Sequence, residues 1–307
     1  MKNTIYYSQA KLLIRILPHI AKETVFALKG GTAINYFLWD LPRLSVDVDL
    51  TYLPIQSRRE SIQEISESVH RIIQGIQYTI PRVKIIPKIE KEFKKIIGCL
   101  VNQDNITVKI ESNLVIRGTV FPVETVSICQ SAVDYFESKV SVPRLSIPDL
   151  FGGKICAALD RQHPRDLYDI HLLLKEEGFS DDIRQAFIVY LISHPRPMVE
   201  LLDPNLKDIK SIFKNEFAGM SRIPVILDDL LETREVLVSQ IKQNLTDNEK
   251  HFILSIKRAE PDWSLSEVEG IDTLPAIRWK ITNIKNMDKK KHKLAVDKLE
   301  RCLGNMY

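Results

Sequence analysis

Apolar and polar residues follow two different patterns in the first part of the chain. Residues 24–29, 45–53 and 105–116 are short apolar or alternating runs, a pattern typical of strands. Residues 57–76 are polar with apolar positions at helical spacing and predict a helix. Strands mixed with helices in this way predict an α+β fold class, with a small mixed sheet in the N-terminal domain.

The pattern changes near residue 145. Apolar residues then recur every three to four positions in segments that Pro, Gly, Asn or Asp interrupt. The predicted helices cover residues 147–162, 164–178, 180–193, 225–245 and 247–259 and the lysine-rich tail. We therefore expect an N-terminal α/β domain over residues 1–145 and a helical domain with a basic C-terminal segment over residues 146–307.

Composition narrows the class of protein. Of 307 residues, 44% are apolar and 27% are charged, as in soluble globular proteins. The first 17 residues predict an amphipathic helix and not a signal peptide, because Lys11 and Arg15 interrupt their apolar stretch. No apolar run approaches the roughly 20 residues of a membrane span. Four cysteines lie far apart, which favours a reducing, cytoplasmic location.

Positive charge is concentrated in two segments, although the net charge is only +3. Residues 278–301 contain nine Lys or Arg and three acidic residues, a local charge of +6. The segment KIEKEFKKI places Lys88, Lys91 and Lys95 at intervals that also suit one face of a helix. Such segments attract polyanions; the alternative is an ordinary solvated surface.

Two aspartates interrupt the strand predicted at residues 45–53. Side chains alternate along a strand, so Asp47 and Asp49 point to the same face, about 7 Å apart. Two such carboxylates suit Mg²⁺ or Mn²⁺, which prefer oxygen ligands. The alternative is the solvent-exposed face of a sheet.

A glycine pair precedes this strand in the sequence LKGGTAINYFL. We expect a strand ending at Lys29, a tight turn at Gly30 and Gly31, and a helix capped by Thr32. Backbone amides at such a turn bind anions, and glycines let a phosphate approach closely. The alternative is an ordinary connection between a strand and a helix.

Together these motifs resemble a known superfamily. Gly-Gly-Thr, a helix and then Arg43-x-Ser45-x-Asp47-x-Asp49 resemble nucleotidyltransferases with the DNA polymerase β-like fold, and more specifically the AbiEii/AbiGii toxin family. The resemblance implies an NTP substrate, Mg²⁺ or Mn²⁺, and a third metal-binding carboxylate on a neighbouring strand. Glu111 is the candidate, and Lys109 shares its strand face; a surface Lys/Glu pair is the alternative. The implied nucleotide-binding residues are Lys29, Gly30, Gly31, Thr32, Ser45 and Lys154.

The segment at residues 149–174 resembles the last two motifs of this family. Lys154, Ala158 and Arg161 are spaced to share a helical face. A lysine there would neutralise phosphate charge; an ordinary surface lysine is the alternative.

The next helix carries Asp166 and Asp169 on one face. The resemblance implies one essential aspartate, and the spacing leaves open which of the two it is. Asp166 also suits the first turn of its helix. His163 and His171 match no metal-ligand spacing.

The sequence and the resemblance together predict a function. We expect transfer of a nucleoside monophosphate to an acceptor hydroxyl, at the 3′ end of a tRNA. The RNA would contact Lys289, Lys290, Lys291 and Lys293, and an antitoxin encoded nearby would neutralise the toxin. The alternatives are a nucleotidyltransferase acting on a protein or small molecule, and a catalytically silent RNA-binding module.

Overall fold

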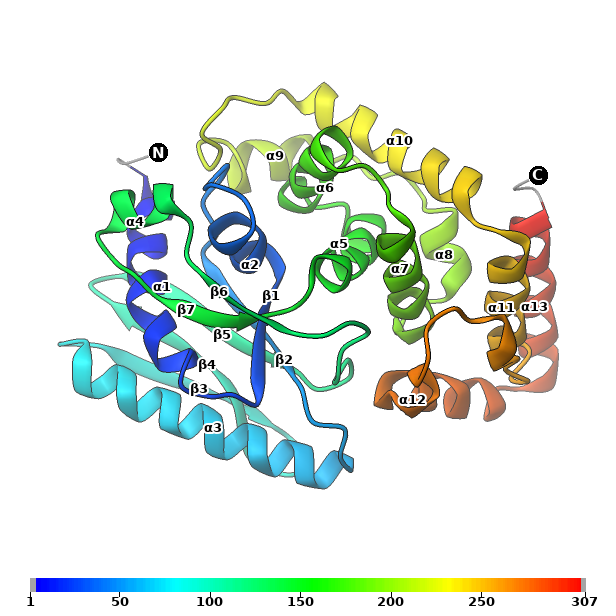
Figure 1. Cartoon of the computed structure of the whole chain (residues 1–307), viewed down its shortest axis with the longest axis horizontal. Coiled ribbons are helices and arrows are strands. Elements are labelled where there is room, and N and C mark those ends of the chain that lie inside the picture. The colour runs from blue at the N-terminus through cyan, green and yellow to red at the C-terminus, as the bar shows by residue number, and fades with distance from the viewer. Residues whose placement is uncertain (1–3, 305–307) are drawn as a thin grey trace. The chain divides into compact units, whose positions relative to one another are not determined.

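The computed structural model describes residues 4–304, which form two compact units (Figure 1). The first unit runs to Ser146 and includes Ala218–Pro224. The second unit comprises Ile147–Phe217 and the chain from Val225 onward. The hydrophobic pattern did not predict that residues Ala218–Pro224 would belong to the first unit.

The first unit is built on a mixed sheet of seven strands in the order β3-β4-β5-β2-β1-β7-β6. The strands are β1 Phe26–Lys29, β2 Asp47–Tyr52, β3 Lys84–Glu90, β4 Lys95–Gln103, β5 Ile106–Asn113, β6 Glu124–Ser127 and β7 Ser141–Arg144. Strand β1 is antiparallel to β2, whereas β2 and β5 are parallel. The predicted mixed sheet is confirmed, but it is larger than the sequence indicates.

Four helices belong to this unit: α1 Ile5–Ile20, α2 Gly30–Phe37, α3 Arg58–Thr79 and α4 Gln130–Phe136. Helices α1 and α3 contact each other, and they contact β5 and β4 respectively. A capping box between Ser57 and Glu60 starts α3, and Ile65, Ile72 and Ile76 are buried on its apolar face. The predicted helix at residues 57–76 is thus confirmed.

Strand β2 lies within the sheet, between β5 and β1. Val48, Leu50 and Tyr52 are fully buried, whereas Asp47 and Asp49 are only partly buried. Burial therefore follows the predicted alternation from Asp47 to Leu50, whereas Thr51 on the face of the aspartates is also buried. Both aspartates lie on one face of β2.

The helical reading of KIEKEFKKI is wrong. Lys88 lies on β3 and Lys95 begins β4, and these strands form an antiparallel hairpin. Strand β4 also pairs with β5 and contacts α3. Hairpin pairing on both sides of β4 therefore outweighs the helical spacing of the lysines.

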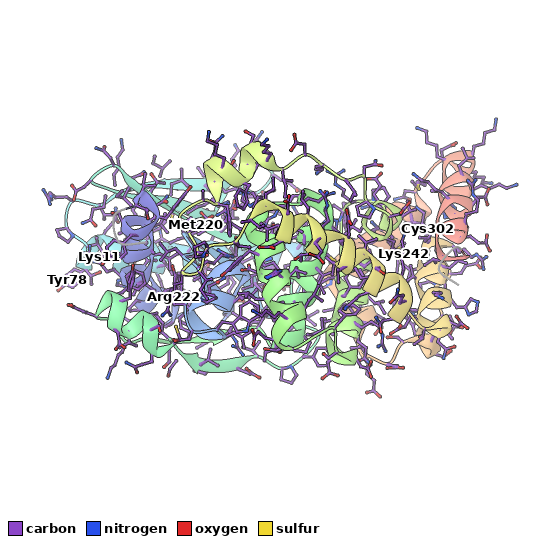
Figure 2. All side chains as sticks on the ribbon, turned by 90° about the horizontal axis from the view of Figure 1, so that it is seen from above. Lys11, Tyr78, Met220, Arg222, Lys242 and Cys302 are labelled. Atoms are coloured by element: carbon purple, nitrogen blue, oxygen red, sulfur yellow. The ribbon has the colours of Figure 1, made fainter. Side chains whose placement is uncertain are left out.

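The returning segment Ala218–Pro224 binds the loop that follows α2. The amide of Leu44 donates to the carbonyl of Met220 (2.9 Å), and Arg222 donates to the carbonyl of Asp40 (3.0 Å). Figure 2 labels Met220 and Arg222 among the side chains. These bonds fix the approach to β2.

The second unit is helical, and no strand is among its described elements. These elements are α5 Ile147–Arg161, α6 Pro164–Glu176, α7 Asp181–Ser193, α8 Met198–Leu202, α9 Lys210–Glu216, α10 Leu227–Asn244, α11 Asp247–Lys257, α12 Pro275–Lys285 and α13 Lys289–Gly304, with two short 3₁₀ helices at Trp263–Leu265 and Ile271–Thr273. Helix α5 packs on α6, α7 and α8, and α10 packs on α6. The predicted helices are confirmed. None of the helices described is long and apolar enough to cross a bilayer.

Candidate active site

A row of paired residues crosses five strands of the sheet. Lys88 on β3 lies opposite Gly98 on β4, which lies opposite Glu111 on β5. Glu111 is paired with Asp49 on β2, and Asp49 with Lys29 on β1. Opposite residues of neighbouring strands point to the same face. Two carboxylates and two lysines are therefore aligned on one face of the sheet.

Asp47 and Lys109 lie beside this row. They are paired with each other, two positions before Asp49 and Glu111 on the same strands. Because side chains two positions apart share a face, Asp47, Asp49 and Glu111 share one face. The structure thus brings the three predicted metal ligands together, with Lys109 among them.

Lysines bind both carboxylate oxygens of Glu111. Lys109 Nζ lies 2.6 Å from Oε2, and Lys88 binds Oε1. Burial by itself would raise the pKa of Glu111, but the hydrogen bonds from Lys109 and Lys88 outweigh it and lower that pKa. Within residues 4–304 no group of three or more Asp, Glu, His or Cys side chains is arranged to hold a metal ion.

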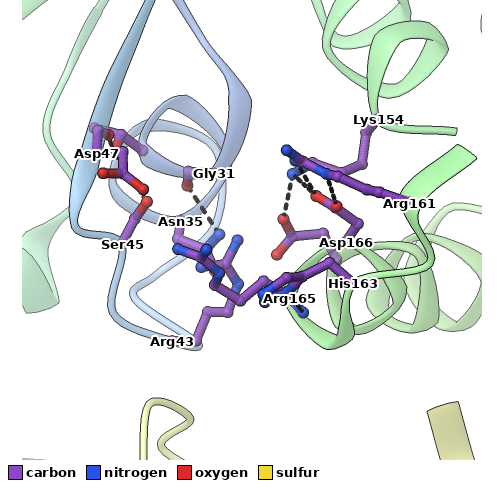
Figure 3. Close-up of polar contacts among 12 residues, drawn as sticks. Gly31, Asn35, Arg43, Ser45, Asp47, Lys154, Arg161, His163, Arg165 and Asp166 are labelled. Atoms are coloured by element: carbon purple, nitrogen blue, oxygen red, sulfur yellow. Dashed lines mark hydrogen bonds and ion pairs between the residues drawn. The ribbon is translucent and has the colours of Figure 1, made fainter. Parts of the chain in front are cut away.

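The glycine pair makes room for the polar side chains of the site. Gly30 has a positive φ of 72°, and a Cβ there would lie 2.9 Å from Oδ2 of Asp49. A Cβ on Gly31 would lie 2.6 Å from Nη2 of Arg43, whose buried guanidinium donates to the carbonyl of Leu44. Figure 3 shows Gly31, Arg43 and Asp47 in this part of the first unit. Only glycine fits at Gly30 without strain.

The prediction that Thr32 caps its helix is wrong, because α2 already begins at Gly30 and Lys29 is its N-cap. The Thr32 hydroxyl donates to the carbonyl of Asp47 (2.6 Å) and lies 3.0 Å from Oγ of Ser45. Tyr36, which sequence reasoning missed, binds both backbone groups of Ser45 through its hydroxyl. Thr32 and Tyr36 therefore position the start of β2 and its aspartates.

In the second unit a buried lysine joins two aspartates. Lys154 Nζ lies 2.9 Å from Oδ1 of Asp166 and 3.0 Å from Oδ2 of Asp169 (Figure 3). Arg161 also binds Asp166. The reading of Lys154 as a surface lysine is wrong, and both candidate aspartates contact it.

Charge pairing holds Asp166 ionised. Burial would raise the pKa of Asp166, but the positive charges of Lys154 and Arg161 outweigh it and set that pKa well below the ordinary range. Asp166 lies in the first turn of α6, as the sequence suggested, but the N-cap of that helix is His163.

Both histidines near these residues have local contacts. His163 accepts from the amide of Arg165 and lies 3.1 Å from Glu216. Nδ1 of His171 lies 2.9 Å from the Thr233 hydroxyl. These bonds connect α6 with α9 and α10.

The basic C-terminal segment forms α12 and α13. Lys289, Lys290, Lys291 and Lys293 are exposed on α13. Lys280 does not belong to this surface, because its ammonium donates to the carbonyls of His194 and Arg196. Burial and the nearby Lys257 lower the pKa of Lys280 to about 8.

Comparison with known proteins finds a family model and similar solved structures. The family model described as nucleotidyl transferase AbiEii toxin, type IV TA system, matches residues 11–283. Among solved structures, the chain is similar to MenT4, a nucleotidyltransferase toxin from Mycobacterium tuberculosis, with 13% identity and a TM-score of 0.45 over 98% of this chain and 92% of that one. No curated protein matches.

Proposed function

Because the chain belongs to the AbiEii family of NTP-dependent nucleotidyltransferase toxins of type IV toxin–antitoxin systems, we propose that it adds a nucleoside monophosphate to the 3′ end of a tRNA and releases pyrophosphate. The family also implies an antitoxin partner. The proposal is carried by the pairing of Asp49 with Glu111 beside Gly30. We place the reaction in the cytoplasm, where NTPs and tRNA are available.

Asp47, Asp49 and Glu111 form one face of the sheet, here called the acidic face, and their donor type suits a divalent metal ion once the lysines leave Glu111. Asp47, Asp49 and Glu111 supply carboxylate oxygens, the donors that Mg²⁺ and Mn²⁺ prefer. Bound there, the metal would neutralise phosphate charge and orient the acceptor hydroxyl. Glu111 would hold the ion through a carboxylate oxygen that a lysine occupies here. Once released, its carboxylate can also accept the proton of that hydroxyl.

The start of α2 suits the β- and γ-phosphates of the NTP. Gly30 and Gly31 have no side chain to block an anion, and amides at a helix start attract negative charge. Lys29, the N-cap of this helix, adds a positive charge. Thr32 and Ser45 hold the backbone of this loop to the start of β2.

Lys154 lies in the second unit. Its ammonium binds both Asp166 and Asp169. The family resemblance implies a role for Lys154 in nucleotide binding, and within the second unit the two aspartates are the residues that position its ammonium.

An RNA acceptor suits the exposed surface of α13. Lys289, Lys290, Lys291 and Lys293 lie within five residues on this helix, and clustered lysines bind the phosphate backbone of RNA. A small-molecule acceptor would have no use for such a surface.

Labelled nucleotide transfer tests the reaction and the acceptor together. The purified full-length protein is incubated with Mg²⁺, total tRNA and each α-³²P-labelled NTP in turn, and the products are separated on a denaturing gel. Wild type should add one or two labelled nucleotides to tRNA. Asp49→Asn keeps the side-chain shape but removes a metal ligand, so it should lose at least about 100-fold in rate while remaining folded.

A matched control is Asp104→Asn, which makes the same change in the exposed turn between β4 and β5. It should transfer at the wild-type rate. Label that enters the protein itself, or a protein from an added lysate, would move the acceptor from RNA to protein. Full activity in Asp49→Asn would remove this residue from the site.

Salt dependence tests the RNA surface. Neutralising Lys289, Lys290 and Lys291 by substitution with Gln should weaken tRNA binding and lower the slope of log K against log salt by about 2 to 3, because each phosphate contact contributes nearly one. The control substitutes Lys210 and Lys214 with Gln on exposed positions of α9. An unchanged slope in the α13 variant would place the RNA elsewhere.

A further inference from the structure

We propose that Lys88, which contacts Glu111 across Gly98, makes metal binding at the acidic face depend on the NTP. The Lys88 ammonium would weaken binding of the divalent ion alone and allow binding of the ion together with the NTP. This inference rests on the metal and NTP site proposed above. It assigns a positioning role to a residue outside the motifs of the sequence.

The path from Lys88 to Glu111 crosses a whole strand. Lys88 lies on the edge strand β3, and β4 separates it from β5. At the crossing point β4 carries Gly98, and a Cβ there would clash with the carbonyl oxygen of Ile110. Lys88 lies opposite Gly98, and its ammonium binds Oε1 of Glu111 across this position.

The second oxygen of Glu111 is also bound. Lys109 Nζ lies 2.6 Å from Oε2, and the negative charges of Glu111, Asp47 and Asp49 contribute to a raised pKa of Lys109, although burial opposes them. A metal ion that takes Glu111 as a ligand therefore has to displace at least one ammonium group. Lys88 is the group to move, because it comes from the outer end of the row, whereas Lys109 also faces Asp47.

Formal charges explain why the NTP matters. The row and its neighbours contain three carboxylates and three lysines, Asp47, Asp49, Glu111, Lys29, Lys88 and Lys109, so the face is formally neutral. A free divalent ion would add two positive charges, which the lysines repel. A triphosphate brings about four negative charges, so the metal ion and the NTP together add about two negative charges, which the lysines attract. Released from Glu111, the Lys88 ammonium can bind a phosphate oxygen.

Direct Mn²⁺ binding tests this inference without measuring activity. The electron paramagnetic resonance signal of unbound Mn²⁺ is titrated with the full-length protein, first alone and then with each of the four α,β-methylene NTP analogues. Wild type should bind Mn²⁺ weakly alone and at least about tenfold more tightly with the preferred analogue. Lys88→Met keeps the chain length but removes the charge, so it should bind Mn²⁺ alone about tenfold more tightly than wild type.

Three further variants define the outcome. Lys88→Arg keeps the charge and should retain wild-type Mn²⁺ affinity, and so should Lys84→Met, which lies on the same strand opposite Asn102. Equal or weaker Mn²⁺ binding by Lys88→Met would overturn the inference. Asp49→Asn should abolish Mn²⁺ binding with and without analogue; wild-type binding in this variant would instead overturn the metal site itself.

Discussion

Each unit of the molecule contains a cluster of lysines and carboxylates, and the two clusters differ in burial. In the second unit the side chains of Lys154, Asp166 and Asp169 are 5%, 2% and 0% exposed. In the first unit Lys88 is 54% exposed, and Glu111 is 26% exposed. Ammonium and carboxylate groups therefore meet in a buried cluster in the second unit and in a partly exposed cluster in the first unit.

The difference in burial separates a permanent contact from an exchangeable one. A buried ion pair has lost its hydration, so removing one partner leaves a charge that neither water nor protein compensates. A half-exposed pair is worth little, because water and salt replace either partner readily. The cluster around Lys154 is therefore suited to hold a fixed geometry, and the one around Glu111 is suited to change partners during binding.

The largest effect is expected at the buried lysine. Lys154→Met keeps much of the side-chain volume but removes the charge that Asp166 and Asp169 share. The free energy of unfolding, measured by urea denaturation, should fall by about 3 to 5 kcal/mol. The control is Lys242→Met on α10, which removes an exposed ion pair with Asp203. It should lower the free energy of unfolding by less than about 1 kcal/mol. Equal losses in the two variants would contradict the contrast.

Acid should lower the contribution to stability of the buried cluster around Lys154 more than that of the exposed cluster around Glu111. The pKa of Asp166 is lowered in the folded state because Lys154 and Arg161 outweigh burial. Its contribution to stability is present above the ordinary carboxyl pKa of about 4 and is lost as the pH falls from there through the folded value. Below pH 4 the wild type should therefore lose stability faster than Asp166→Asn, by up to about 1.4 kcal/mol per pH unit.

The control for the acid experiment comes from the other cluster. The pKa of Glu111 is also lowered, with burial outweighed by hydrogen bonds from Lys109 and Lys88, so the sign is the same. Because Glu111 is more exposed, Glu111→Gln should change the acid slope less than Asp166→Asn. A larger change in Glu111→Gln would reverse the ranking of the two clusters.

The sequence predicted those parts of the site that depend on local pattern. The alternation along β2 predicted the common face of Asp47 and Asp49, because strand geometry alone determines it. Glu111 was predicted with the help of the family resemblance, which implies a third carboxylate on a neighbouring strand. The role of Gly30 could also be anticipated, because a turn between strand and helix often requires glycine.

The remaining parts depend on contacts between distant residues. Lys88 and Lys95 have a spacing that fits a helix, but the pairing of β4 with β3 and with β5 places them on strands, and Lys91 lies in the turn between β3 and β4. Gly98 lies at the position where Lys88 on β3 contacts Glu111 on β5 across β4. The burial of Lys154 likewise depends on α6, a different helix. Hydrophobic periodicity contains no information on such pairings.

The smallest effect is expected at the exposed lysine. Lys88→Met should change the free energy of unfolding by less than about 1 kcal/mol in low salt, because the ammonium is more than half exposed. In about 1 M NaCl, where charges are screened beyond roughly 3 Å, this difference should vanish, whereas most of the loss in Lys154→Met should remain. Urea titrations of both variants at the two salt concentrations measure this directly. A Lys88→Met loss that persists in high salt would show that Lys88 supports the sheet, and its exchange of partners at Glu111 would then have to be abandoned.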